Sequence, residues 1–111
     1  MTEDLRLSAV LQRLEKTIAS RRSADPESSY TASLLHAGVQ RCAKKFGEEA
    51  VEATIAAVAG NKKALTEETA DVLYHLIVLL NAAGVSLDDV AGALAAREGT
   101  SGHEEKAGRQ N

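Results

Sequence analysis

The 111-residue sequence has little of what builds disulfide-rich, aromatic or membrane-spanning proteins. It contains one cysteine, no tryptophan, two tyrosines and one phenylalanine. Because a single cysteine has no partner in the chain, Cys42 cannot form an intramolecular disulfide bond. The longest aliphatic run, residues 76–80, is far shorter than the roughly 20 residues that cross a bilayer, and the N-terminus lacks a signal-peptide pattern. We therefore expect a cytoplasmic protein that does not contact a membrane.

The charge balance argues against a second class of partner. The formal net charge is −3, and the sequence has no basic stripe, so nothing draws the chain generally toward nucleic acid. An anionic ligand would need a local group of opposite charge to attract it.

The length of the chain bears on its oligomeric state. Because a domain this short buries only about 60–70 % of the surface of its unfolded chain, a monomer would be only marginally stable and we expect a homodimer.

Hydrophobic periodicity predicts an all-α fold without strands. Apolar residues spaced three and four apart indicate amphipathic helices, and glycine, proline and serine mark the breaks. The predicted helices cover residues 4–21, 32–37, 39–59, 63–83 and 87–97. Thr31 is the predicted cap of the second helix, and Ser86 with Asp89 forms a capping-box-like start for the last. We expect a four- to five-helix bundle with a central antiparallel helical hairpin in a domain of residues 1–97, followed by a flexible tail, 98–111.

The helix predicted over residues 39–59 is apolar on two sides. Val51, Ile55 and Val58 lie on a different face from the apolar stripe that contains Cys42. A helix with two apolar faces needs two partners, so we expect the protein to dimerise through helix faces.

Two acidic clusters flank the turn predicted at Gly60. Glu52 lies eight residues before Gly60 and Glu68 eight after it, while Glu49 lies eleven before and Asp71 eleven after. In an antiparallel hairpin with a rise of about 1.5 Å per residue, each pair lies at one height above the turn. The two acids on each helix are also three residues apart and share an edge, so all four carboxylates can converge.

Four like charges in one place repel each other unless cations neutralise them. Carboxylate ligands without cysteine favour a hard ion, so the spacing predicts a site for Mg²⁺, with Mn²⁺ as a substitute. Since Mg²⁺ often keeps substrate phosphates among its ligands, the expected ligand is a metal-bound polyphosphate. The alternative is that these acids form an ordinary solvated helix face.

The acidic clusters resemble those of the MazG-type all-α nucleoside polyphosphate pyrophosphohydrolases. The matching motifs are Glu48-Glu49-x-x-Glu52 and Glu68-x-x-Asp71. Within that group, Lys44-Lys45-x-Gly47-Glu48-Glu49 and Tyr74-His75 are similar to the phosphoribosyl-ATP pyrophosphohydrolase family, and the likeness covers about residues 5–97. It implies Mg²⁺-dependent hydrolysis of the α–β phosphoanhydride of phosphoribosyl-ATP to phosphoribosyl-AMP and pyrophosphate, the second step of histidine biosynthesis.

Helix position and this resemblance together give each candidate residue a role. The predicted metal ligands are Glu49, Glu52, Glu68 and Asp71. The catalytic candidates are Glu49 and Glu48, but helix geometry points Glu48 away from the acidic edge, so it is either a surface residue or the weaker choice for a water-orienting base. The substrate-binding candidates are Lys45, Lys44, His75 and Tyr30.

Each substrate-binding candidate also has an ordinary structural interpretation. Lys45 either contacts phosphate or neutralises the acids, and Lys44 can be a solvated surface residue. His75 follows Asp71 by one turn, so it either touches the substrate or is a buried core residue. Tyr30 is placed to stack on the nucleotide or hydrogen-bond to it.

Two other functions fit the sequence at this point. A house-cleaning hydrolase of ordinary or damaged nucleoside triphosphates shares the acidic motif. A non-catalytic helical dimerisation module would need none of the metal chemistry, and its carboxylates would be a solvated face.

Overall fold

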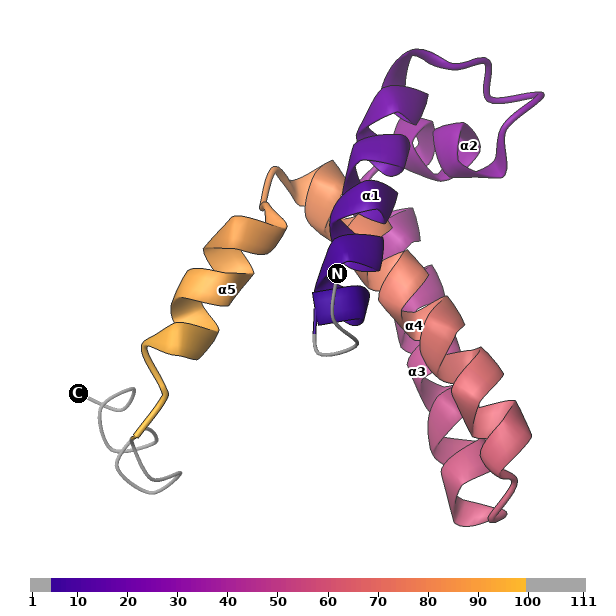
Figure 1. Cartoon of the computed structure of the whole chain (residues 1–111). Helices are drawn as coiled ribbons and strands as arrows, with labels where there is room; N and C mark the ends of the chain where they lie inside the picture. The colour runs from indigo at the N-terminus through magenta and orange to yellow at the C-terminus, as the bar shows by residue number, and fades with distance from the viewer. Residues whose placement is uncertain (1–4, 100–111) are drawn as a thin grey trace.

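A computed structural model describes residues 5–99, and this part of the chain is helical, without strands (Figure 1). The elements are α1 (Arg6–Ser20), the 3₁₀ turn η2 (Arg21–Ser23), α2 (Tyr30–Ala37), α3 (Val39–Val58), α4 (Lys62–Ala83) and α5 (Leu87–Ala95). The all-α prediction is confirmed, and the predicted ends differ from these by at most two residues. Of the predicted tail, only Glu98 and Gly99 lie within the described residues, where they form a turn.

The antiparallel pair α3 and α4 is the longest feature of the fold, and the two helices run side by side in Figure 1. The reversal between them takes only three residues, 59–61, and two of these explain how it is made. Gly60 has φ +73°, a left-handed conformation that glycine adopts without strain. Asn61 caps α4, and its side-chain oxygen accepts a hydrogen bond from the backbone N–H of Ala64 at 3.0 Å. These residues produce the predicted central hairpin.

The hydrophobic core lies where α1 and α2 pack against the hairpin. Its buried residues come from four helices and are Ile18, Leu34, Cys42, Ile77 and Val78. Helix α4 contacts α1, α2 and α3, which explains the run of apolar residues at 76–80 in its second half. The thiol of Cys42 is buried and donates to the carbonyl of Leu34 at 3.2 Å, so this cysteine has a structural role.

The start of α2 differs from the prediction. Thr31 does not cap this helix, because α2 begins at Tyr30 and Ser29 is its cap. The Ser29 hydroxyl accepts from the backbone N–H of Ala32 at 3.1 Å, whereas the Thr31 hydroxyl bonds to Tyr74 on α4. At the other end Gly38, with φ +97°, separates α2 from α3. The helix therefore starts early enough for Tyr30 and Thr31 to face α4.

Helix α5 leaves the bundle and points away from the hairpin in Figure 1. It starts with the predicted capping box, in which Ser86 and Asp89 bond each other's backbone N–H groups. None of its residues is buried, and Leu94 is 58 % exposed. Within residues 5–99 no single helix is long and apolar enough to cross a membrane. Helices α4 and α5 taken together are long and apolar enough, but the angle between them is 104°.

Candidate functional site

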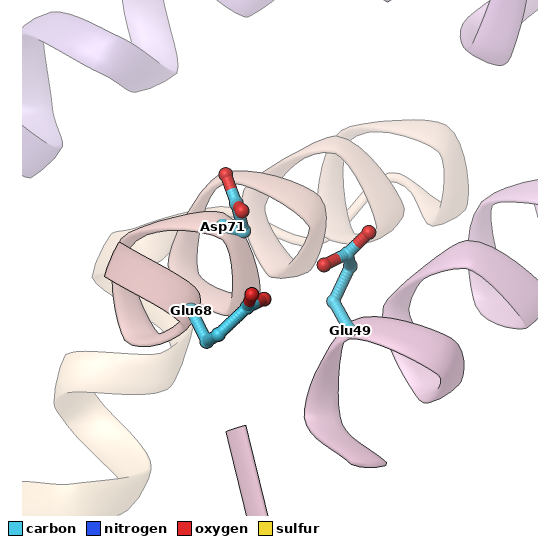
Figure 2. Close-up of side chains that lie close together, drawn as sticks. All are labelled: Glu49, Glu68 and Asp71. Carbon is cyan, nitrogen blue, oxygen red and sulfur yellow. The ribbon is translucent and has the colours of Figure 1, made fainter. Parts of the chain in front are cut away.

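Three of the four predicted metal ligands come together between α3 and α4. Glu49, Glu68 and Asp71 each offer one carboxylate oxygen, and these three oxygens lie within 4.8 Å of one another. Figure 2 shows Glu49, from α3, directed toward Glu68 and Asp71 on α4. We call these three residues the carboxylate cluster.

The hairpin explains why residues so far apart in sequence meet. Glu49 and Asp71 lie equally far from Gly60 along their helices, so an antiparallel arrangement brings them to the same level. Glu68 lies one turn before Asp71 on the same edge of α4. The mirrored spacing thus becomes a spatial cluster.

Glu68 lies where its negative charge is least favourable, because one of its oxygens is buried and other carboxylates are close. Its Oε2 atom is inaccessible to solvent and has no hydrogen-bond partner among the described residues. The pKa of Glu68 is raised, first because its carboxyl loses water and then because of the negative charge of Glu52 and a hydrogen bond that the two carboxyl groups can share. The charges of Asp71 and Glu49 raise it further. The cluster therefore holds more negative charge than its surroundings neutralise.

Glu52 lies beside the cluster rather than in it. It is exposed, and its carboxylate is not among the three oxygens that lie within 4.8 Å, so the predicted convergence of all four acids is incomplete. It is close enough to Glu68 to raise the pKa of that residue. The two glutamates also line an open groove of about 330 Å³ that runs toward the hairpin turn, together with Ile55, Ala56, Ala59, Asn61 and Ala64.

The donor set fits a hard divalent cation. All three clustered ligand atoms are carboxylate oxygens, the type that Mg²⁺ and Mn²⁺ prefer. A buried oxygen without a partner costs free energy, and a bound cation would satisfy Oε2 of Glu68. These residues could therefore hold such an ion.

None of the three charged residues just before Glu49 belongs to the carboxylate cluster. The Lys45 ammonium is 3.7 Å from Oε1 of Glu48, and both side chains are partly exposed. Lys44 is also exposed. Lys45 is therefore paired with Glu48, which is not one of the clustered acids, and that Glu48 points away from the acidic edge stays a prediction.

His75 and Tyr30 form a hydrogen-bonded chain that ends on the backbone of Asp71, a member of the cluster. Nδ1 of His75 is 2.9 Å from the backbone carbonyl oxygen of Asp71. Because a carbonyl only accepts, Nδ1 carries a proton, and Nε2 is hydrogen-bonded to the Tyr30 hydroxyl at 3.2 Å. His75 is 6 % exposed and Tyr30 54 %.

The sequence did not indicate this chain or the neighbouring bond between Thr31 and Tyr74. Both depend on how the first turn of α2 packs on α4, which local periodicity does not encode. One usable signal was that two adjacent hydroxyl residues, Tyr30 and Thr31, are matched by the adjacent pair Tyr74 and His75.

Comparison with known proteins gives consistent matches over most of the chain. A sequence profile described as phosphoribosyl-ATP pyrophosphohydrolase matches residues 11–98. A protein named phosphoribosyl-ATP pyrophosphatase from Cereibacter sphaeroides is 59 % identical, over 90 % of this chain and 97 % of its own length. Proteins of the same name are 58 % identical in Paracoccus denitrificans, over 90 % of this chain and 93 % of that protein, and 54 % identical in Azorhizobium caulinodans, over 99 % and 98 %.

Proposed function

The chain belongs to the phosphoribosyl-ATP pyrophosphohydrolase family, and from this premise we propose that the carboxylate cluster is its catalytic metal site. As a member of that family it is an enzyme that hydrolyses phosphoribosyl-ATP to phosphoribosyl-AMP and pyrophosphate, the second step of histidine biosynthesis. The proposal concerns the cation, the residues that hold it and the residues that bind the substrate. We also assign this activity to a domain of residues 1–97 and expect it in the cytoplasm.

The observation that carries the proposal is the unsatisfied Oε2 of Glu68 within a cluster of three carboxylates. An acidic protein must also bind a highly charged anion. A divalent cation held by the cluster would both satisfy the Glu68 oxygen and attract the anionic substrate. We propose Mg²⁺, with Mn²⁺ as a substitute, because every ligand atom is an oxygen. Glu49, Glu68 and Asp71 would hold the ion directly, and Glu52 lies beside them to complete the set.

When bound, such a cation neutralises charge on phosphoryl oxygens and activates water. The chain itself must then orient the attacking water and take up its proton. A carboxylate has two oxygens, so Glu49 can give one to the cluster and accept a hydrogen bond from water with the other. We prefer Glu49 to Glu48 for this role because the Glu48 carboxylate pairs with Lys45 outside the cluster.

Substrate binding is assigned to groups around this edge. The Lys45–Glu48 pair is long, at 3.7 Å, and solvent-accessible, so exchanging Glu48 for a phosphate costs little. Lys44, the residue before Lys45, is exposed and is available to bind the same phosphate. The exposed ring of Tyr30 can stack on the nucleotide, while His75 supports Tyr30 through its hydrogen bond.

We propose that the protein is a homodimer formed through the outer face of α3. Val51, Ile55 and Val58 on this face are 58, 63 and 85 % exposed, which is unusual for three aliphatic residues on one helix stripe. The face adjoins the groove beside Glu52 and Glu68, because Ile55 lines both. A second copy would therefore cover apolar surface next to the metal site. The acidic balance gives no reason to add nucleic acid or a membrane as a partner.

The experiment that tests this function is a substrate panel. Pyrophosphate release is measured from phosphoribosyl-ATP, ATP and the four deoxynucleoside triphosphates, each with Mg²⁺ and with EDTA. We expect turnover of phosphoribosyl-ATP alone, abolished by EDTA. Preference for deoxynucleoside triphosphates would point to a house-cleaning enzyme instead, and absence of any turnover by folded protein would favour the dimerisation module.

A further inference from the structure

Four residues join the first turn of α2 to α4 just beyond the carboxylate cluster. Tyr30 is hydrogen-bonded to His75, and Thr31 to Tyr74, so two adjacent residues on one helix bond to two adjacent residues on the other. The rings of Tyr74 and His75 meet edge to face with centroids 4.9 Å apart, and the ring of Tyr30 lies edge-on to His75 at 6.1 Å. We call these four residues the α2–α4 clasp.

Only one of the two pairs leads to the cluster. His75 donates from Nδ1 to the carbonyl oxygen of Asp71 and is hydrogen-bonded through Nε2 to the Tyr30 hydroxyl, so both ring nitrogens have partners. The ring is almost fully buried and therefore has no water to replace a lost partner. The Thr31–Tyr74 pair joins the same two helices, but its hydroxyl groups bond to each other rather than to the turn that carries Asp71.

We propose that Tyr30 is a positioning residue of the metal site. By holding the His75 ring against the Asp71 carbonyl, Tyr30 fixes the turn of α4 that presents the Asp71 carboxylate to Glu68 and Glu49. The inference rests on the proposed function, because it concerns the geometry in which the cluster meets a cation. It gives Tyr30 a role that is exerted before any substrate binds.

The size of the effect can be bounded. Groups that orient metal ligands commonly change metal affinity by about 10–100-fold when they are removed. Tyr30 acts through His75 and through a backbone atom, so we expect the lower end of this range. Because Tyr30 is half-exposed, losing its hydroxyl leaves the buried core of α1, α2, α3 and α4 in place.

The test is Mn²⁺ binding to the full-length protein without substrate, followed by calorimetry or by the Mn²⁺ electron paramagnetic resonance signal. The variants are Tyr30→Phe and, as a matched control, Thr31→Val, since each removes one hydroxyl from the clasp. We expect Tyr30→Phe to weaken Mn²⁺ binding about tenfold and Thr31→Val to change it by less than about twofold. Equal weakening in both, or an unchanged dissociation constant in Tyr30→Phe, overturns the inference.

A second readout separates positioning from direct substrate contact. With Mg²⁺ at saturation, the KM of Tyr30→Phe for phosphoribosyl-ATP returns to the wild-type value if Tyr30 acts through the metal site. A raised KM at saturating Mg²⁺ with unchanged Mn²⁺ binding means that the hydroxyl contacts substrate, and this overturns the inference alone. Failure of the wild type to bind Mn²⁺ overturns the proposed metal site and the inference with it.

Discussion

Glu52 on α3 and Glu68 on α4 line the same groove, and the negative charge of Glu52 raises the pKa of Glu68. The charged form of Glu68 is destabilised further, because its Oε2 atom is also cut off from solvent. Such an arrangement opposes folding unless a cation is present. The residues that weaken the metal-free protein are thus the ones that we propose as ligands of the ion.

Replacing Glu68 should therefore separate stability from activity. In the metal-free protein, Glu68→Gln removes one negative charge from the cluster and should raise the melting temperature. It also removes a ligand, so we expect pyrophosphate release to fall at least about tenfold and the stabilisation by Mg²⁺ to shrink. Thermal unfolding with EDTA and with Mg²⁺ checks this. A Glu68→Gln protein that is less stable than wild type in EDTA would contradict the account of the cluster.

The raised pKa of Glu68 also predicts a pH dependence. The folded state binds the Glu68 proton more tightly than the unfolded state, so the free energy of unfolding falls as pH rises from about 4.3, the ordinary glutamate pKa, through the raised value. Denaturant titrations in EDTA across this window should show the fall in wild type and a smaller fall in Glu68→Gln. Identical pH profiles for the two proteins would show that Glu68 does not titrate differently on folding.

Much of this site followed from sequence spacing. Equal distances from Gly60 were enough to predict that Glu49 would meet Asp71, because helices have a fixed rise and the turn is short. The same reasoning placed Glu52 fully in the cluster, yet its exposed side chain lies beside it. Backbone height fixes the level of a residue in the hairpin but not the rotamer of a long side chain.

The beginning of α2 was harder to predict because two hydroxyl residues there, Ser29 and Thr31, compete for the role of helix cap. Ser29 and Thr31 are both good helix caps, and the choice between them depends on contacts with α4. Thr31 bonds to Tyr74, which leaves Ser29 as the cap. The capping box of α5 was predictable because Ser86 and Asp89 bond only within their own turn.

That capping box should stabilise α5 locally. Its hydrogen bonds to Ser86 lower the pKa of Asp89, so the stabilisation is present above the ordinary aspartate pKa and is lost as pH falls through the lowered value. Replacing Ser86 with alanine should cost about 1 kcal/mol of helix stability. Hydrogen exchange checks this: α5 amides should exchange faster in Ser86→Ala, while those in the α3–α4 hairpin keep their protection. Equal loss in the hairpin would show that α5 is not an independent unit.

The proposed dimer can be tested by placing a charge on the outer face of α3. Val58→Glu should reduce the molar mass measured by light scattering from that of a dimer to that of a monomer, because a buried unpaired carboxylate opposes association. Leu94→Glu is the matched control, since Leu94 is also an exposed aliphatic residue but lies on α5. A monomeric wild type would contradict the proposed dimer. Dissociation by Leu94→Glu alone would place the interface on α5 instead of α3.

The most direct test of the central claim compares two adjacent glutamates. Glu49 lies in the carboxylate cluster and Glu48 pairs with Lys45 outside it, so Glu49→Gln and Glu48→Gln make the same chemical change in different places. With Mg²⁺ and phosphoribosyl-ATP, we predict that kcat/KM falls by about 100-fold or more in Glu49→Gln, equivalent to about 2.7 kcal/mol of transition-state stabilisation, and less than tenfold in Glu48→Gln. The opposite order, or near-wild-type activity in Glu49→Gln, would contradict the assignment of this cluster as the catalytic metal site.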